Sequence, residues 1–241
     1  MKLYKSLALA GLLSFALLST NPGFADKRAE LAEKLPSVSV DQINESWVKG
    51  IYAVDLGERY AYVTEDGKHL FVGELINMEN GQNHSRIEIG KKRVDAINNI
   101  PEENFIIFPA KDKKHTIIVF TDIDCTWCRR FHAEINDYSE LGIEVKYLLR
   151  PRSGPQSKSW QKADSVFCSK NQQKNLTRAK QGMDVSIKNC KSSKVKDNVD
   201  YAETLGFMGT PVILSEGGQH LGGYVKAADL VKQLEAEKAG S

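Results

Sequence analysis

The chain has 241 residues, of which 41% are hydrophobic and 27% charged, a balance that allows a buried core and excludes an intrinsically disordered chain. Its formal net charge of +2 gives no indication of a nucleic-acid partner or of binding to an anionic membrane surface. A chain of this length forms one large domain or two small ones.

The N-terminus has the pattern of a secretory signal peptide. Lys2 and Lys5 precede an apolar run over residues 7–18, and small residues stand before a cleavage site after Ala25. The run is shorter than the roughly 20 residues that a membrane span needs, so we expect no membrane insertion. Residues 1–25 are therefore predicted to be a cleaved signal peptide.

The cysteines indicate the compartment that the exported chain reaches. There are four, an even number, and all of them lie in the second half of the chain. In an oxidising compartment such a set forms disulfides or carries redox chemistry. Together with the signal peptide, the cysteines predict a periplasmic protein.

Residues 26–86 are predicted to form a small strand-rich domain. Aromatic and β-branched runs flank Asp66-Gly67, a pair that favours a hairpin with a tight primed turn because glycine tolerates a positive φ. A piece of about 60 residues without cysteine buries too little surface to be robust alone, and pairing with a second copy is a common remedy. We therefore expect this domain to form a homodimer; the alternative is that it packs onto the rest of its own chain.

Residues 87–104 are predicted to link this domain to the second half of the chain. Apolar residues between Ile87 and Ile100 alternate with charged ones, and Pro101 follows. This pattern predicts an amphipathic helix that ends before the proline.

Residues 105–241 are predicted to form a second domain with mixed helices and strands. In chain order we expect a strand, a helix, a strand, a helical stretch, a two-stranded hairpin and a helix, over residues 115–121, 125–138, 143–149, 156–206, 211–214 with 219–224, and 227–236. The first three elements make a β-α-β unit, which requires a parallel pair of strands, and the hairpin adds antiparallel strands.

Two cysteines stand two residues apart in the stretch Asp-Cys-Thr-Trp-Cys-Arg-Arg, as Cys125 and Cys128. Covalent haem attachment requires a histidine directly after the second cysteine, where this chain has Arg129. Structural zinc requires two more ligands, usually as another close pair, but Cys168 and Cys190 are far apart in the sequence. The pattern therefore favours a redox couple that needs no metal and no other cofactor.

The placement of the pair predicts different roles for the two sulfurs. Cys125 stands at the start of the predicted helix, where unpaired backbone N–H groups stabilise a thiolate, helped in part by Arg129 and Arg130 and opposed by Asp124. Its pKa should therefore lie below the free-thiol value of about 8.5. Cys128, one turn later, should be more buried and protonated, and should resolve a mixed disulfide on Cys125. His132 stands seven positions after Cys125, and we expect it at the surface.

A strand before Cys-x-x-Cys at a helix start, with a distant Thr210-Pro211 before a hairpin, resembles the thioredoxin fold. In that family the proline is cis, and its loop lies beside the reactive cysteine, where the preceding residue pairs with an extended substrate. The resemblance extends over residues 26–241 to the DsbC/DsbG proteins, through the signal peptide, the linker and the segments Tyr62-Val-Thr-Glu-Asp-Gly-Lys-His69, Val119-Phe-Thr-Asp122 and Gly209-Thr-Pro211.

That resemblance implies an α+β chain with a strand-rich N-terminal dimerisation domain, a linker helix and a thioredoxin-like catalytic domain with a helical insertion. It implies a periplasmic, V-shaped homodimer that isomerises disulfides in misfolded or misoxidised exported proteins, acts as a chaperone, and receives electrons from the membrane reductase DsbD. Cys168 and Cys190 match a second cysteine pair in DsbC, which implies a structural disulfide worth about 3 kcal/mol. The alternative for this pair is a thiol relay.

One departure from the family leaves the redox balance open. DsbC-type sites typically have Gly-Tyr between the cysteines, whereas this chain has Thr126-Trp127. The dipeptide helps to set the redox potential, and Trp127 is a candidate for substrate contact. The alternatives to an isomerase are therefore a net oxidant that resembles DsbA and a holdase chaperone without catalysis.

Overall fold

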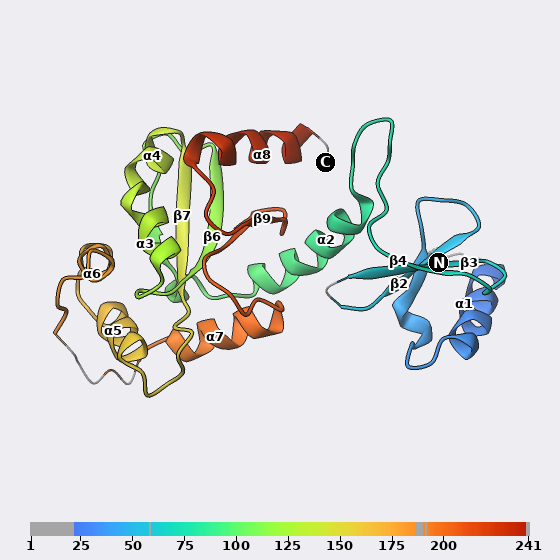
Figure 1. The fold of residues 1–241 in the computed structure, drawn as a ribbon, viewed down its shortest axis with the longest axis horizontal. Coiled ribbons are helices and arrows are strands. Elements are labelled where there is room, and N and C mark those ends of the chain that lie inside the picture. The colour runs from blue at the N-terminus through green and yellow to red at the C-terminus, as the bar shows by residue number, and fades with distance from the viewer. Residues whose placement is uncertain (1–21, 58, 187–189, 191, 240–241) are drawn as a thin grey trace, which may run out of the picture. The chain divides into compact units, whose positions relative to one another are not determined.

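The computed structural model describes residues 22–239 apart from residues 58, 187–189 and 191 (Figure 1). Residues 1–21, most of the predicted signal peptide, therefore lie outside the described residues. In the described part of the chain, no helix is long and apolar enough to cross a membrane. The chain forms two compact units. The N-terminal unit consists mainly of residues up to Phe71, and the C-terminal unit mainly of the residues after it.

The N-terminal unit is built on a four-stranded antiparallel sheet, as the sequence predicts. Its elements are α1 (Pro22–Lys34), a 3₁₀ turn (Val40–Gln42), β1 (Ile43–Glu45), β2 (Ile51–Asp55), β3 (Tyr60–Thr64) and β4 (Leu70–Val72), with the strand order β1-β2-β3-β4. Ile43 of β1 pairs with Val54 on the neighbouring antiparallel strand β2. These two side chains are buried together with Leu31 of α1 and Val63 of β3, so one helix and one sheet share a small core.

The hairpin between β3 and β4 forms where it is predicted. The prediction of a tight primed turn is wrong, because the strands are joined by a wider loop. Thr64 N–H donates to His69 O at 3.0 Å, which leaves a four-residue loop over residues 65–68. Gly67 has the expected positive φ, 69°. A Cβ at this position would lie 2.7 Å from Lys34 Cδ and 3.3 Å from Leu31 Cδ2, so α1 lies directly against the turn. The Thr64 hydroxyl donates to Asp66 Oδ1 at 2.6 Å and stabilises the wider loop.

The predicted linker helix is present as α2 (His84–Asn98). Asn83 caps its N-terminus by accepting a hydrogen bond from Arg86 N–H at 3.0 Å. Arg93 lies 4.8 Å from the centre of the Phe207 ring. A Cβ on Gly90 would lie 2.9 Å from the backbone oxygen of Gly217, so the helix packs closely on the turn of the C-terminal hairpin.

The C-terminal unit contains a five-stranded mixed sheet with helices on both faces. After a 3₁₀ turn (Glu102–Asn104), its elements are β5 (Ile106–Phe108), β6 (His115–Thr121), α3 (Thr126–Ala133), α4 (Ile135–Glu140), β7 (Ile143–Leu149), α5 (Lys158–Phe167), α6 (Gln172–Lys180), α7 (Val195–Thr204), β8 (Val212–Ser215), β9 (His220–Gly222) and α8 (Ala227–Ala239). The strand order is β5-β7-β6-β8-β9.

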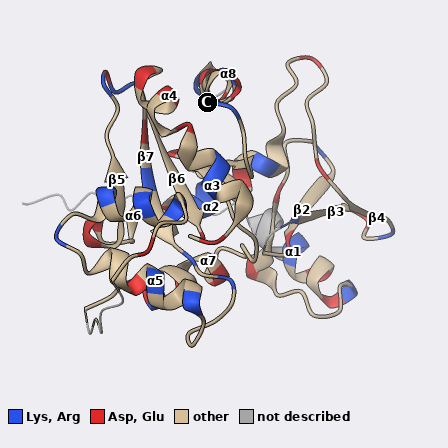
Figure 2. Cartoon of the chain, turned by 60° about the vertical axis from the view of Figure 1, so that its left-hand side comes forward, with Lys and Arg blue, Asp and Glu red and all other residues tan. Residues whose placement is uncertain are grey.

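The strand pairing confirms the predicted topology. β6 and β7 are parallel from His115↔Ile143 to Thr121↔Leu149, and they lie side by side at the centre of the sheet (Figure 1). β8 pairs antiparallel with β6, and β9 with β8. Every residue of β6 is buried, and the strand contains no Lys, Arg, Asp or Glu, whereas the surrounding helices carry both signs (Figure 2). Such a strand is typical of a sheet covered on both faces.

Each face of this sheet has its own core. On one face, Val119 of β6, Tyr147 of β7 and Phe131 of α3 are fully buried with apolar side chains of α4, α5, α6 and α8. On the other face, Phe120 of β6 and Leu148 of β7 pack with side chains of α2 and α7. Helix α3, which contains Cys128, therefore rests on one face, and the linker helix α2 on the other.

Two predictions for this unit need correction. β5 was not predicted; it has only three residues and pairs at the sheet edge with β7. The single helix predicted from Cys125 to Tyr138 is divided into α3 and α4 at Glu134, whose φ and ψ of −99° and 17° are not helical. The Glu134 carboxylate accepts a hydrogen bond from Tyr224 O–H at 2.7 Å, so a residue far along the chain holds the break.

Candidate redox-active site

The two close cysteines lie at the end of β6, where α3 begins. Cys125 is the N-cap residue of α3, and Arg129 N–H donates to its backbone oxygen at 2.9 Å. Both cysteines are free thiols, with Cys125 3% exposed and Cys128 0% exposed. Cys128 is therefore the more buried of the two, as predicted.

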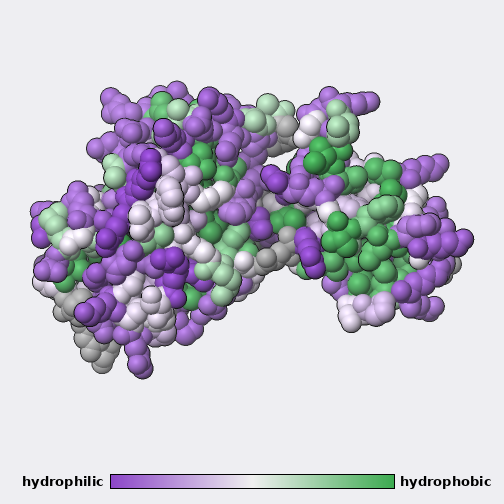
Figure 3. Space-filling view, in the orientation of Figure 1, coloured by the Kyte–Doolittle hydropathy of each residue, from purple (hydrophilic) through white to green (hydrophobic). Residues whose placement is uncertain are grey.

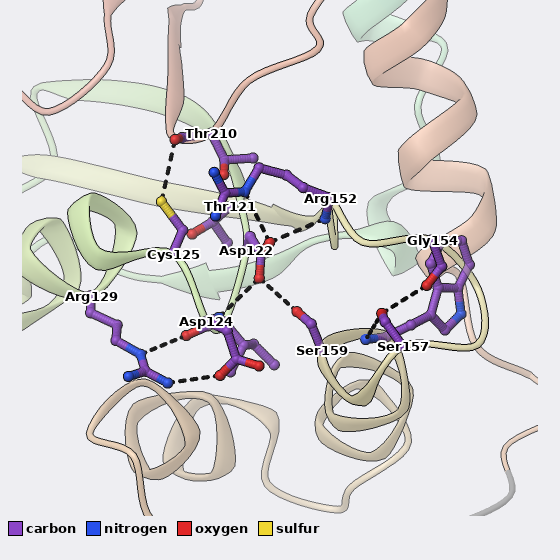
Figure 4. Close-up of polar contacts among 12 residues, drawn as sticks. Thr121, Asp122, Asp124, Cys125, Arg129, Arg152, Gly154, Ser157, Ser159 and Thr210 are labelled. Atoms are coloured by element: carbon purple, nitrogen blue, oxygen red, sulfur yellow. Dashed lines mark hydrogen bonds and ion pairs between the residues drawn. The ribbon is translucent and has the colours of Figure 1, made fainter.

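The distant Thr210-Pro211 segment meets this helix start. The peptide bond between Thr210 and Pro211 is cis, which confirms the prediction. The Cys125 thiol donates a hydrogen bond to the backbone oxygen of Thr210 at 3.3 Å (Figure 4). The Thr210 hydroxyl is buried and makes no hydrogen bond within ordinary distance, yet it lies close enough to lower the pKa of both thiols. The fold thus brings together four of the predicted site residues, Cys125, Cys128, Thr210 and Pro211.

The two thiols have pKa values shifted in opposite directions. Burial raises the pKa of Cys125, but the nearby backbone N–H and thiol of Cys128, the Thr210 side chain and the charge of Arg152 together outweigh burial, so the pKa is lowered. Burial of Cys128 dominates over the nearby Lys180 charge, so its pKa is raised. Cys125 is therefore the more readily ionised sulfur.

The backbone N–H of Cys128, at the helix start, helps to lower the pKa of Cys125 as predicted, but Arg129 and Arg130 are not the arginines that act there. Arg129 donates to Ile123 O at 2.9 Å and forms an ion pair with Asp124 at 2.7 Å. Arg130 lies 5.0 Å from the centre of the Tyr224 ring. The arginine whose charge lowers the pKa of Cys125 is Arg152, which follows β7. Nothing in the local spacing distinguishes it, because the contact depends on how β6 and β7 pair.

Asp122 holds Arg152 beside the site through a buried hydrogen-bond network (Figure 4). Its Oδ1 accepts from Asp124 N–H at 2.9 Å and Ser159 O–H at 2.7 Å. Its Oδ2 accepts from the backbone N–H and the Nε–H of Arg152 at 3.1 and 3.2 Å. Burial alone would raise the pKa of this carboxyl, but the hydrogen bonds outweigh burial and lower it. The carboxylate joins the loop before Cys125, the segment after β7 and α5.

The dipeptide between the cysteines faces outward. Thr126 and Trp127 are both exposed, and Trp127 stacks on Tyr224 with 5.8 Å between ring centres. Arg130 lies over both rings. Trp127 is therefore held in one place by a partner from the segment after β9, which the sequence did not reveal.

His132 was expected at the surface, and this expectation is wrong. The side chain is 3% exposed. Its Nδ1 lies 3.1 Å from Tyr147 Oη, and its Nε2 lies 2.9 Å from Thr177 Oγ1. Burial, with the charge of Lys180, lowers its pKa to about 3, so the ring is neutral at physiological pH. His132 lies one turn after Cys128 on the same inward face of α3, a position that burial of Cys128 already implies.

The second cysteine pair forms a disulfide between Cys168 and Cys190, as the resemblance implies. Cys168 is the C-cap residue of α5, and Cys190 precedes α7, with Cα atoms 6.1 Å apart. In the part of the chain that the structure describes, no group of three or more His, Cys, Asp and Glu side chains could hold a metal ion.

Both units match known protein families. Residues 19–86 match the N-terminal domain of disulfide bond isomerase proteins, and residues 101–238 match the thioredoxin-like domain. The thiol:disulfide interchange protein DsbC of Haemophilus influenzae is 33% identical over 86% of this chain and 90% of that protein. DsbC of Escherichia coli K12 is 28% identical over 93% and 95%. Proteus mirabilis ScsC, solved in a transitional conformation, aligns with a TM-score of 0.52 at 21% identity over 64% of this chain and 81% of that chain, a similarity of fold alone.

A thioredoxin-like sheet with Cys-x-x-Cys at a helix start and a cis-proline loop beside it defines a thiol:disulfide oxidoreductase. The matches over both units make the assignment narrower. The chain belongs to the DsbC family of thiol:disulfide interchange proteins, which confirms the resemblance seen in the sequence. It is an enzyme of the isomerase type within that class.

Proposed function

We propose that this chain is a periplasmic homodimeric isomerase that reshuffles incorrect disulfides in misfolded or misoxidised exported proteins, with an associated chaperone activity. One observation supports the catalytic assignment above all. The Cys125 thiol lies at the N-terminus of α3 with a lowered pKa, beside the Thr210 backbone oxygen of the cis-proline loop. A thiolate at that position can attack a disulfide that approaches along the loop.

The proposed reaction begins at Cys125. Its thiolate attacks one sulfur of a substrate disulfide; a bond forms between the two sulfurs, the substrate S–S bond breaks, and the second substrate sulfur leaves as a thiolate. That thiolate either attacks another sulfur of the substrate and completes isomerisation, or remains reduced while Cys128 displaces the substrate from Cys125. The second route leaves the Cys125–Cys128 pair oxidised, so a reductant must restore it.

Two further groups are assigned to the substrate. The Thr210 and Pro211 segment is proposed to hold an extended substrate backbone, because the Thr210 oxygen already accepts a hydrogen bond from the attacking thiol. Thr126 and Trp127 are proposed to set the redox balance and to contact the substrate, since both are exposed beside Cys125. The Cys168–Cys190 disulfide is proposed to be structural, because it ties the end of α5 to the segment before α7.

The resting state of the pair tests the isomerase against the oxidant. An isomerase requires the Cys125–Cys128 pair to be reduced, and we propose that the membrane reductase DsbD supplies the electrons. Thiol trapping in the intact periplasm should therefore find the pair predominantly reduced, and oxidised in cells without that reductase. A pair that is predominantly a disulfide in otherwise normal cells would contradict the proposal and favour the net oxidant.

The division of labour along the chain is also proposed. Residues 1–25 are assigned to the signal peptide, 26–86 to dimerisation, 87–104 to the linker and 105–241 to catalysis. Support for dimerisation comes from β4, an edge strand of its sheet, whose Leu70, Phe71 and Val72 are 51%, 54% and 62% exposed. Hydrophobic side chains gather over the N-terminal sheet in Figure 3. An exposed apolar edge strand is a site where a second chain can pair.

Phe71→Glu should weaken the dimer strongly. If β4 lies in the interface, each dimer of this variant must bury two carboxylates, and a penalty of several kcal/mol raises the dissociation constant by about 100-fold or more. Sedimentation velocity over a range of concentrations measures this constant. Lys68→Glu, in the exposed loop before β4, is the matched control and should leave the dimer intact. A Phe71→Glu protein with unchanged mass would show that the dimer, if one forms, does not use β4.

A further inference from the structure

Lys180, the last residue of α6, is a lysine in the interior of the C-terminal unit. This residue is only 4% exposed. Lys180 Nζ donates to Thr121 Oγ1 at 2.8 Å and to Asp122 O at 3.4 Å, and it lies 5.7 Å from the centre of the Tyr147 ring. These hydrogen bonds go to neutral oxygens and not to a carboxylate. A buried charge with such partners is costly, which indicates a role beyond stability.

The packing of α6 on α3 brings this lysine behind the buried cysteine. His132 of α3 and Thr177 of α6 form a hydrogen bond of 2.9 Å that sets the two helices in register. Cys128 lies four residues before His132, and Lys180 lies three residues after Thr177. Residues at these spacings share one face of a helix, so Cys128 and Lys180 point into the same space. The positive charge of Lys180 acts on both Cys128 and His132.

Thr121 lies between the lysine and the sulfur. It is the last residue of β6 and is 1% exposed. Its oxygen accepts a hydrogen bond from Lys180, and its side chain lies close enough to Cys128 to lower the pKa of that thiol. A hydroxyl can accept one hydrogen bond and donate another at the same time. Lys180, Thr121 and Cys128 are thus connected in series without passing through solvent.

We propose that Thr121 and Lys180 form a buried relay that takes the proton from Cys128 when it resolves the mixed disulfide, and returns it when the pair is reduced again. In this relay Thr121 touches the reacting sulfur, whereas Lys180 acts through Thr121 as a positioning residue. The inference rests on the proposed resolving role of Cys128.

The resolving step balances without any added reactant. The proton of the Cys128 thiol passes to Thr121 Oγ1 while the hydroxyl proton of Thr121 passes to the neutral amine of Lys180. The Cys128 thiolate then attacks Cys125 Sγ, a bond forms between the two cysteines, and the bond from Cys125 to the substrate sulfur breaks. The substrate sulfur leaves as a thiolate and takes a proton from water. The cysteine pair is oxidised by two electrons, and the substrate is reduced by two.

The charges around Lys180 support this exchange. Burial lowers the pKa of Lys180 to about 8, against the opposing effects of Cys128, Asp122 and Cys125, and Arg129 lowers it further. His132, on α3, is neutral because its pKa is low, and Tyr147, on β7, is neutral because burial raises its pKa. A group with a pKa near the working pH can both give and accept a proton, which an exposed lysine near 10.4 cannot do efficiently.

The two steps can be separated with the aromatic disulfide DTNB as the probe in stopped-flow measurements on the full chain. Cys125 releases the first thionitrobenzoate anion, and Cys128 releases the second when it resolves the mixed disulfide. In Lys180→Met we expect the second phase to be about tenfold slower at neutral pH, since a tenfold smaller thiolate fraction corresponds to one pKa unit. Its pH profile should also lose the inflection near pH 8, while the first phase changes little.

A second pair of variants tests the hydroxyl. Thr121→Val removes the hydroxyl at nearly constant volume and should slow the second phase as Lys180→Met does, whereas Thr121→Ser should retain most of the rate. Lys174→Met, on the exposed side of α6, is the matched control for loss of a lysine and should behave as the wild type.

The outcomes distinguish the relay from other roles of these residues. A purely structural role predicts a lower melting temperature in Lys180→Met and equal slowing of both phases, which would overturn the proposal. An unchanged second phase in Lys180→Met, or equal rates in Thr121→Val and Thr121→Ser, would also overturn it. If Lys180→Met does not fold, the two threonine variants decide. Absence of the first phase in the wild type would instead contradict the proposed role of Cys125.

Discussion

Cys125→Ser is expected to reduce the refolding of a scrambled, disulfide-containing substrate to the rate seen without the protein. A serine hydroxyl does not ionise near neutral pH and cannot form or break an S–S bond. The helix start and Thr210, which help to lower the pKa of the Cys125 thiol, therefore cannot restore the activity. The measurement is the recovery of activity of the scrambled substrate in a glutathione buffer. The fold should be unchanged, because serine is isosteric and also favoured as an N-cap residue.

Cys128→Ser is the matched control for this experiment. The variant retains the attacking thiol but lacks the resolving one, so it should accumulate mixed disulfides with substrate that are visible on non-reducing gels. Full retention of refolding activity by Cys125→Ser would show that the effect on substrate comes from binding alone, as in a holdase chaperone, and would rule out thiol catalysis as its cause.

Asp122→Ala is expected to lower the free energy of unfolding of the C-terminal unit by about 2–4 kcal/mol, because the Ser159 hydroxyl and the backbone N–H groups of Asp124 and Arg152 lose their hydrogen-bond acceptor. Asp122 is 2% exposed, and its loss leaves Arg152 and Ser159 without their partner and opens a cavity below the site. Urea unfolding followed by circular dichroism measures the change. Asp124→Ala, two residues away, is the control; its ion pairs are one third exposed, so we expect a loss below about 1 kcal/mol.

The pH dependence of this difference follows from the lowered pKa of Asp122. In the unfolded chain an aspartate has a pKa near 3.9, and in the folded chain Asp122 has a lower one. The stability that it contributes is therefore fully present above about pH 4 and is lost as the pH falls through the folded-state pKa. The difference between wild type and Asp122→Ala should accordingly narrow below pH 4. A difference that stays constant down to pH 2 would show that the carboxylate charge is not its source.

Much of the fold could be predicted from local patterns. β6 and β7 match the predicted strands residue for residue, because β6 contains a continuous apolar and β-branched run and β7 begins with apolar and charged residues in alternation. The break between α3 and α4 could not be predicted, since it occurs at Glu134 with a hydrogen bond from Tyr224. The hairpin turn at Gly67 differs for a similar reason, because α1 packs against it.

By itself, the sequence determined the chemistry of this protein through a redox pair at a helix start and a strand-rich N-terminal domain, while its resemblance to a known family implied the cis-proline loop and the second disulfide. These features depend on residue type and short spacing, which act within one or two elements. Only the tertiary structure decided which charges act on the sulfurs. Arg152 reaches Cys125 because β6 and β7 pair in parallel, and Lys180 reaches Cys128 because α6 packs on α3 through His132 and Thr177. Electrostatic effects depend on distance in space and on burial, and neither quantity is contained in the spacing of residues along the chain.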